Sequence, residues 1–298
     1  MKTRLTVFAA ALLLLPLCGL LLGGGEWADL PHHAIAPAAS PAALLLTAML
    51  LASYYLLVNQ LVGRLTGTRP FQLQRDYFLW VGAASAALGW LLAYLNLYVA
   101  SWGTQSGDPY MLILLCTPLF ALLAPAVLVT RSLLGAFGGP LRRLSRIAPL
   151  PALRADTAAF FLLPLTALGL LGGPIWPEAL DWLLWLSPLL LLAALQLLWG
   201  EGTVFGALLS GNWARLVFAA LGGIAVGNIA VSSYQLFGGT LAIVPAPLFV
   251  QAGYAAFGLL CLQLGDVIAE SWRGKQRPNP NRKKPFPIPV VTRTPPTR

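Results

Sequence analysis

Five polar side chains stand inside long apolar stretches, and they are the first candidates for chemistry: Asn96, Asn228, Ser232, Gln251 and Tyr254. Asn228 and Ser232 are one helical turn apart, as are Gln251 and Tyr254 approximately, so each pair shares a helix face. One hypothesis is a polar cavity between these stretches that receives a substrate headgroup. The alternative is hydrogen bonding between helices, at about 1 kcal/mol or less per contact. The second interpretation is favoured, because no ionisable residue stands at the middle of any apolar stretch.

A second group of candidates lies in the stretch 25–33, where Glu26 and Asp29 accompany the only two histidines, His32 and His33. Such groups could serve as general acid and base or hold a metal. Adjacent histidines on an extended loop diverge, however, and no third ligand is positioned by spacing. A solvated loop is the simpler interpretation, and no metal site or cofactor is predicted. A transferase with a lipid-linked donor, using Glu26 or Asp29 as base, is the enzyme alternative by analogy alone.

Charged side chains also gather at the ends of the apolar stretches. Arg142, Arg143 and Arg146 alternate with apolar residues at helical spacing, which predicts binding to anionic lipid headgroups. Asp266 and Glu270 are one turn apart at the exit of the last apolar stretch, and ordinary solvation of a helix end explains them. Between the sixth and seventh apolar stretches, a segment interrupted by glycines begins near residue 201. This segment could fold partly back into the membrane, although a position outside the membrane is the favoured interpretation.

The elements that position these residues follow from the composition of the chain. Of 298 residues, 58% are hydrophobic and 10% are charged, and the mean hydropathy is +0.75. A soluble domain carries about a quarter charged residues, so lipid must be the solvent for most of this chain. The apolar runs do not alternate with polar residues as barrel strands do, and helices satisfy their own backbone groups in lipid. We therefore expect an all-α, polytopic transmembrane helical bundle.

A membrane-crossing helix needs about 20 apolar residues, and about eight stretches qualify. They are Leu5–Gly24, Ala42–Val62, Tyr77–Ser101, Tyr110–Thr130, Ala158–Ile175, Leu180–Trp199, Leu216–Phe237 and Pro247–Ile268. The first stretch could alternatively be a cleaved signal peptide, because basic residues precede it and small residues follow it.

The basic residues predict the orientation of the bundle. With the N-terminus inside, all 19 Lys and Arg fall in the inner segments, and the outer segments hold only acidic charges. Basic residues resist translocation. We therefore expect a multi-pass protein of the cell inner membrane with both termini in the cytoplasm. The positive charge is mainly a property of the tail, so a nucleic-acid partner is not predicted.

The domain organisation is predicted as a transmembrane bundle over 1–272 and a disordered, basic, Pro-rich cytoplasmic tail over 273–298. Similar Pro, Gly-Gly and Trp-x-acid spacings in the first and fifth stretches suggest a 4+4 tandem repeat. The halves would be 1–134 and 157–272, joined by a basic connector over 135–156, with a pseudo-twofold axis along the membrane normal. Chance matching in a Leu-rich sequence is the alternative.

Possible partners follow from the same features. Membrane lipid is the first, and Gly223 and Gly227 form a small-residue face that could pack on a partner membrane protein or on a neighbouring helix of the bundle. The function predicted from the sequence is binding or moving an apolar or amphipathic small molecule, or serving as a subunit of a membrane complex. No nucleophile elbow, phosphate loop or HExxH motif indicates a specific reaction.

Overall fold

The helices of the protein are described by a computed structural model. The described residues are 40–67, 69–103, 109–137, 155–200, 202–209 and 211–272. The predicted stretch 5–24, residues 138–154 of the predicted connector 135–156, and the tail from residue 273 onward lie outside them.

Six long helices carry most of the described chain. They are α2 (Pro41–Thr66), α4 (Arg75–Val99), α5 (Pro109–Ala136), α8 (Pro177–Leu198), α10 (Ala214–Leu236) and α11 (Pro247–Trp272). A seventh rod begins as α6 (Ala155–Ala167), continues through the π-helical turn Leu168–Gly172 and ends as α7 (Gly173–Ile175). Two short helices, α3 (Pro70–Leu73) and α9 (Gly206–Leu209), and two short strands, β1 (Trp102–Gly103) and β2 (Ala242–Ile243), connect the long ones.

Within the described ranges, seven helices are long and apolar enough to cross a membrane. They coincide, to within a few residues at each end, with the second to eighth stretches predicted from the sequence. The all-α fold and the multi-pass character are therefore confirmed. The first predicted stretch lies outside the described residues, so a total of eight stays a prediction.

Helix boundaries follow from local chemistry, as α2 shows. Ser40 caps its N-terminus by accepting a hydrogen bond from the backbone N–H of Ala43 at 3.3 Å, and Pro41 occupies the first helical position. Gly67 then ends the helix in the left-handed conformation, with a φ of 74°, which glycine adopts without strain.

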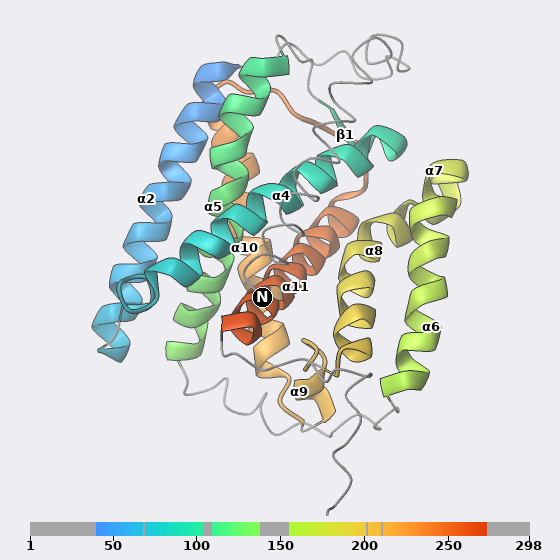
Figure 1. Ribbon diagram of the computed structural model, residues 1–298. Helices are drawn as coiled ribbons and strands as arrows, with labels where there is room; N and C mark the ends of the chain where they lie inside the picture. Colours follow the sequence, from blue (N-terminus) through green and yellow to red (C-terminus); the bar gives the residue numbers. More distant parts are fainter. Residues whose placement is uncertain are drawn as a thin grey trace, which may run out of the picture.

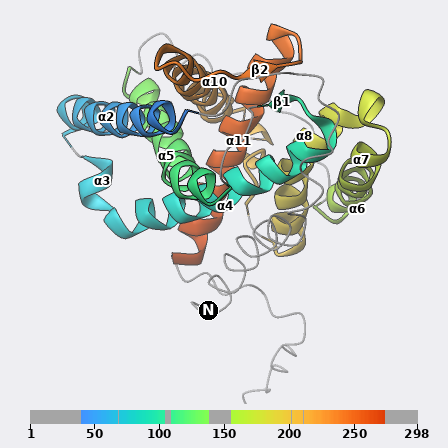
Figure 2. The same ribbon diagram turned by 90° about the horizontal axis from the view of Figure 1, so that it is seen from above.

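The long helices pack around α5 and α11. Helix α5 packs against both α2 and α4, and α10 packs against α11 and α5. Helix α4 crosses the front of the bundle obliquely in Figure 1, while α6 packs mainly against α8 at the edge of the molecule (Figures 1 and 2). Many large apolar side chains remain exposed, among them Phe160 and Phe161 of α6, as expected for a surface that faces lipid.

The small-residue face of α10 is used inside the chain. A Cβ atom added at Gly223 would lie 2.6 Å from the Cα of Gly258 in α11, and one added at Gly227 would lie 2.6 Å from the ring of Tyr254. No side chain fits at these positions, so the two glycines let the backbones of α10 and α11 approach closely. The face is therefore occupied by a neighbouring helix, and a partner chain there stays a prediction.

The described chain contains the same order of elements twice. The order α2, α3, α4, β1, α5 is followed later by α8, α9, α10, β2, α11. Strands β1 and β2 pair antiparallel with each other, and Trp102 is opposite Ile243. The contacts between the two sets are also reciprocal, because α2 packs against α10 as α4 does against α8, and α5 packs against α10 as α11 does against α4.

Two short sequence matches between the halves, Ser-Pro at 40–41 and 187–188 and Pro-Leu-Phe at 118–120 and 247–249, do not coincide with this repeated order. Ser40 precedes α2, whereas Ser187, its apparent counterpart, lies in the middle of α8. Pro118 lies inside α5, whereas Pro247 begins α11. These short residue matches therefore do not define the repeated order of elements, and a tandem repeat stays a prediction.

Candidate functional site

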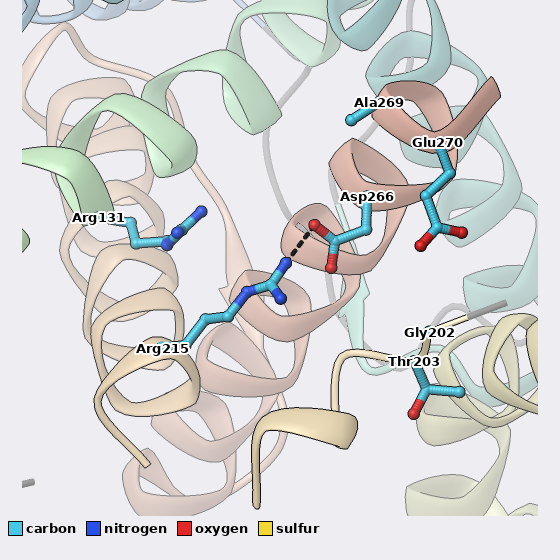
Figure 3. A pocket seen from close by; sticks show the side chains of 7 residues that line it. All are labelled: Arg131, Gly202, Thr203, Arg215, Asp266, Ala269 and Glu270. Atoms are coloured by element: carbon cyan, nitrogen blue, oxygen red, sulfur yellow. Dashed lines mark hydrogen bonds and ion pairs between the residues drawn. The ribbon is translucent and has the colours of Figure 1, made fainter. Parts of the chain in front are cut away.

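A pocket of about 400 Å³ opens where α5, α10 and α11 meet the linker between α8 and α10 (Figure 3). Its size is within the range of small-molecule sites. The lining residues are Arg131, Gly202, Thr203, Arg215, Asp266, Ala269 and Glu270.

Three helices supply the charged side chains of this pocket. Arg131 lies near the C-terminal end of α5, and Arg215 lies at the N-terminus of α10. Asp266 and Glu270 are one helical turn apart near the C-terminal end of α11, so both project from the same face. Four charged groups from distant parts of the sequence thus meet at one end of the bundle.

The linker between α8 and α10 closes one side of the pocket. Val204 is fully buried among residues of the main core, and Phe205 packs against the same core. These two apolar side chains fix the linker against the helices, which places Gly202 and Thr203 in the pocket wall. A Cβ added at Gly202 would lie 3.5 Å from Oε1 of Glu270, so the linker backbone runs close to that carboxylate.

The charges of the pocket are only partly matched. Arg215 donates to Asp266 in an ion pair, marked by the dashed line in Figure 3. Arg131 and Glu270 lie on opposite sides of this pair, and neither forms an ion pair with any residue that the structure describes. Among the described residues, Nε of Arg215 and Oε2 of Glu270 are also buried without a hydrogen-bond partner. Polar atoms in this condition are costly unless a ligand, ion or water satisfies them.

Two of the residues predicted for a substrate cavity, Asn228 and Gln251, bond to each other. Nδ2 of Asn228 donates to Oε1 of Gln251 at 2.8 Å, and Nε2 of Gln251 donates to Oδ1 of Asn228 at 2.9 Å. Asn228 also donates to the carbonyl of Ile224 one turn earlier in α10. The two amides therefore satisfy most of each other's hydrogen-bonding capacity and join α10 to α11.

The other three predicted residues do not join this amide pair by any hydrogen bond that the structure describes. The amide of Asn96 bonds the backbone of Trp102 in both directions, at 2.7 and 3.1 Å, and so fixes the turn from α4 to β1. Ser232 is exposed, and the ring of Tyr254 packs against Gly227. The pocket at the end of the bundle is lined by none of the five.

A buried amide pair that the sequence analysis did not single out joins α8 to α11. Gln196 and Gln263 are both fully buried, and their amide ends lie 2.8 Å apart. The amide of Gln263 also lies 2.7 Å from the backbone nitrogen of Ala193 and 3.3 Å from the carbonyl of Leu189. It is thus inserted beside one hydrogen-bonded turn of α8.

Ser85 has a similar position between α4 and α5. Its Oγ donates to the carbonyl of Phe120 at 2.5 Å and accepts from the backbone N–H of Ala124 at 3.0 Å. The amide pairs and Ser85 thus form hydrogen bonds across helix interfaces. Among the described residues, three other buried atoms of the bundle have no hydrogen-bond partner: the hydroxyl oxygens of Tyr55 and Tyr234, and Nε2 of Gln196.

The remaining candidates from the sequence lie outside the described residues: Glu26, Asp29, Arg142, Arg143 and Arg146. Within the described part of the chain, no group of three or more His, Cys, Asp or Glu side chains is placed to hold a metal ion.

The pocket is not evident from the sequence, because each of its charged residues has a separate explanation there. Solvation of a helix end explains Asp266 and Glu270, and the inner side of the membrane explains Arg131 and Arg215. The sequence does contain one indication, since Asp266, Arg131 and Arg215 all lie within three residues of the predicted end of an apolar stretch. What the sequence lacks is any indication that three such ends meet.

Comparison of the chain with protein-family models, with curated proteins and with solved structures finds no match.

Proposed function

We propose that this chain is a multi-pass protein of the cell inner membrane that binds an amphipathic molecule by its polar headgroup in the pocket of Arg131, Arg215, Asp266 and Glu270. The observation that carries the proposal is the incomplete pairing of charges in a pocket of about 400 Å³. The four charged residues are half-buried, and a site that served only packing would be expected to pair them, because an unpaired charge in a poorly solvated place is destabilising.

The position of the pocket supports a ligand that belongs to the membrane. It lies at the ends of apolar helices, where lipid headgroups meet the protein surface. The acyl part of an amphipathic ligand would lie along the exposed apolar surface of the spans. The segregation of Lys and Arg in the sequence supports a cytoplasmic position for this end of the bundle and for both chain termini.

The proposal also includes a tandem repeat of four spans in each half, with a pseudo-twofold axis along the membrane normal. The duplicated element order, the β1–β2 pair and the reciprocal helix contacts support it. Parallel repeats of this kind occur in transporters, in which the two halves move relative to each other around a binding site. The repeat therefore favours movement of the bound molecule over a purely structural role in a membrane complex.

The binding site can be tested with the Arg131→Gln variant. The protein is purified in detergent, and binding of phosphatidylglycerol and of phosphatidylethanolamine is measured separately by native mass spectrometry. Loss of one charge-assisted contact, worth about 1.5–3 kcal/mol, weakens binding by about tenfold or more for both lipids.

The matched control is Arg64→Gln, which removes the same charge from an exposed position in the last turn of α2. It leaves the pocket intact and is expected to bind both lipids like the unmodified protein. Equal binding by both variants and the unmodified protein would overturn the proposal. Thermal unfolding of each variant in the same detergent verifies that lost binding is not lost folding.

A further inference from the structure

The headgroup pocket has two features that together restrict what it binds. Arg131 and Arg215 are matched in number by Asp266 and Glu270, so the formal charge of the described lining is zero. Arg215 and Asp266 neutralise each other directly. The charges left without an ion-pair partner among the described residues are therefore one guanidinium, that of Arg131, and one carboxylate, that of Glu270.

These two remaining groups do not pair with each other, although their charges are opposite. Arg131 projects from α5 and Glu270 from α11, and the Arg215–Asp266 pair lies between them (Figure 3). Arg131 and Glu270 form no ion pair with each other in the described structure. A ligand with one charge would satisfy only one of them and would leave the other unmatched in the pocket.

We propose that the pocket recognises a zwitterionic headgroup, an aminoalkyl phosphate ester, with its phosphate at Arg131 and its ammonium at Glu270. This inference rests on the proposed function and names the ligand class of the same site. A guanidinium binds phosphate oxygens through parallel N–H donors. An ammonium group supplies three donors, which suits a carboxylate that lacks a partner. Thr203, which lies on the Glu270 side of the pocket, offers a hydroxyl beside the ammonium position.

An anionic headgroup without an amine fits this pocket less well. Phosphatidylglycerol would place its phosphate at Arg131, but its glycerol would leave the Glu270 carboxylate without a cation. Its hydroxyl groups could only donate neutral hydrogen bonds to that carboxylate, which are about half as strong as charge-assisted ones. The structure therefore favours phosphatidylethanolamine over phosphatidylglycerol.

The test compares these two lipids on the purified full chain in a non-ionic detergent, which has no charged headgroup to compete, with either lipid added as a minor, spin-labelled component. The unmodified protein is expected to prefer phosphatidylethanolamine by about tenfold. Glu270→Gln keeps the shape of the side chain and removes its charge, and it is expected to bring the preference close to one. Glu270→Asp retains the charge on a shorter side chain and is expected to keep part of the preference.

Soluble phosphoethanolamine distinguishes a lipid headgroup from a free metabolite. Competition at millimolar concentration supports recognition of the headgroup itself, whereas binding as tight as that of the lipid would overturn a membrane source. An unchanged preference in Glu270→Gln would overturn the zwitterion proposal. That result, combined with loss of binding in Arg131→Gln, would leave the proposed function standing. Equal binding of both lipids by Arg131→Gln and by the unmodified protein would remove both proposals.

Discussion

The middle of the bundle and the pocket at its end differ in whether their polar side chains have partners. In the middle, Gln196 meets Gln263, Asn228 meets Gln251, and Ser85 bonds two backbone groups of α5. At the pocket, Arg131 and Glu270 have no ion-pair partner among the described residues. Both regions lie between helices of the same membrane protein.

This difference distinguishes polar groups that stabilise the bundle from polar groups that remain available to bind a ligand. In an apolar interior, an unsatisfied amide costs free energy, so the amides occur in complementary pairs. Near a helix end, water and headgroups can satisfy charges, so incomplete pairing is tolerated until a ligand binds. Polar residues in a span thus indicate a site only when their capacity is not already used by a neighbour.

The largest expected effect in the middle of the bundle comes from a small change at Gly223. In Gly223→Val the added atoms would overlap the backbone of α11 at Gly258, so the two helices must move apart. Overpacking of this kind costs about 1–3 kcal/mol, and backbone overlap places this variant near the upper value. The melting temperature in detergent, measured by loss of the monodisperse peak after heating, is expected to fall clearly.

Gly253→Val is the matched control for that change. Gly253 lies on the same helix pair, is exposed, and has no atom within 4 Å of an added Cβ. Its melting temperature is expected to stay near that of the unmodified protein. If both variants melted alike, close α10–α11 packing would not be a source of stability, and the middle of the bundle would be less tightly built than the comparison requires.

Most of the fold was predictable because lipid imposes a simple rule on sequence. A helix in lipid satisfies its own backbone, so the length of an apolar run predicts a span without knowledge of its neighbours. The stretch Leu216–Phe237, for example, corresponds to α10 (Ala214–Leu236). The π-helical turn Leu168–Gly172 was not predicted, because a change of helical register leaves no mark in hydropathy.

The sites were less predictable, because they depend on which helices are neighbours. Asn228 and Gln251 bond to each other, and the sequence favours such a contact because α10 and α11 are consecutive spans joined by a short connection. Asn96 was grouped with them by its residue type, yet it bonds the turn directly after its own helix. The pocket requires α5 to approach α10 and α11, and nothing in the spacing of Arg131 and Asp266 along the chain indicates that contact.

A smaller effect is expected from breaking the buried amide pair. Gln263→Leu keeps a side chain of similar size but leaves the Gln196 amide, which is fully buried, without its partner. An unsatisfied buried polar group costs about 1–3 kcal/mol, and partial rearrangement places this variant near 1 kcal/mol. The double variant Gln196→Leu with Gln263→Leu is expected to regain part of the lost stability. If the double variant lost more stability than the two single variants lose together, the two amides would not act as a pair.

The smallest effect is expected at Asn228, and it sharpens the comparison most directly. Asn228→Leu breaks a pair that is only partly buried, so Gln251 can turn toward other donors and acceptors. Interhelical hydrogen bonds of this kind contribute about 0.6 kcal/mol on average in membrane proteins. The variant is therefore expected to fold, to melt slightly earlier and to bind phospholipid like the unmodified protein. If binding were instead lost at normal stability, the Asn228–Gln251 pair would belong to the ligand site, and the separation between structural middle and binding end would be wrong.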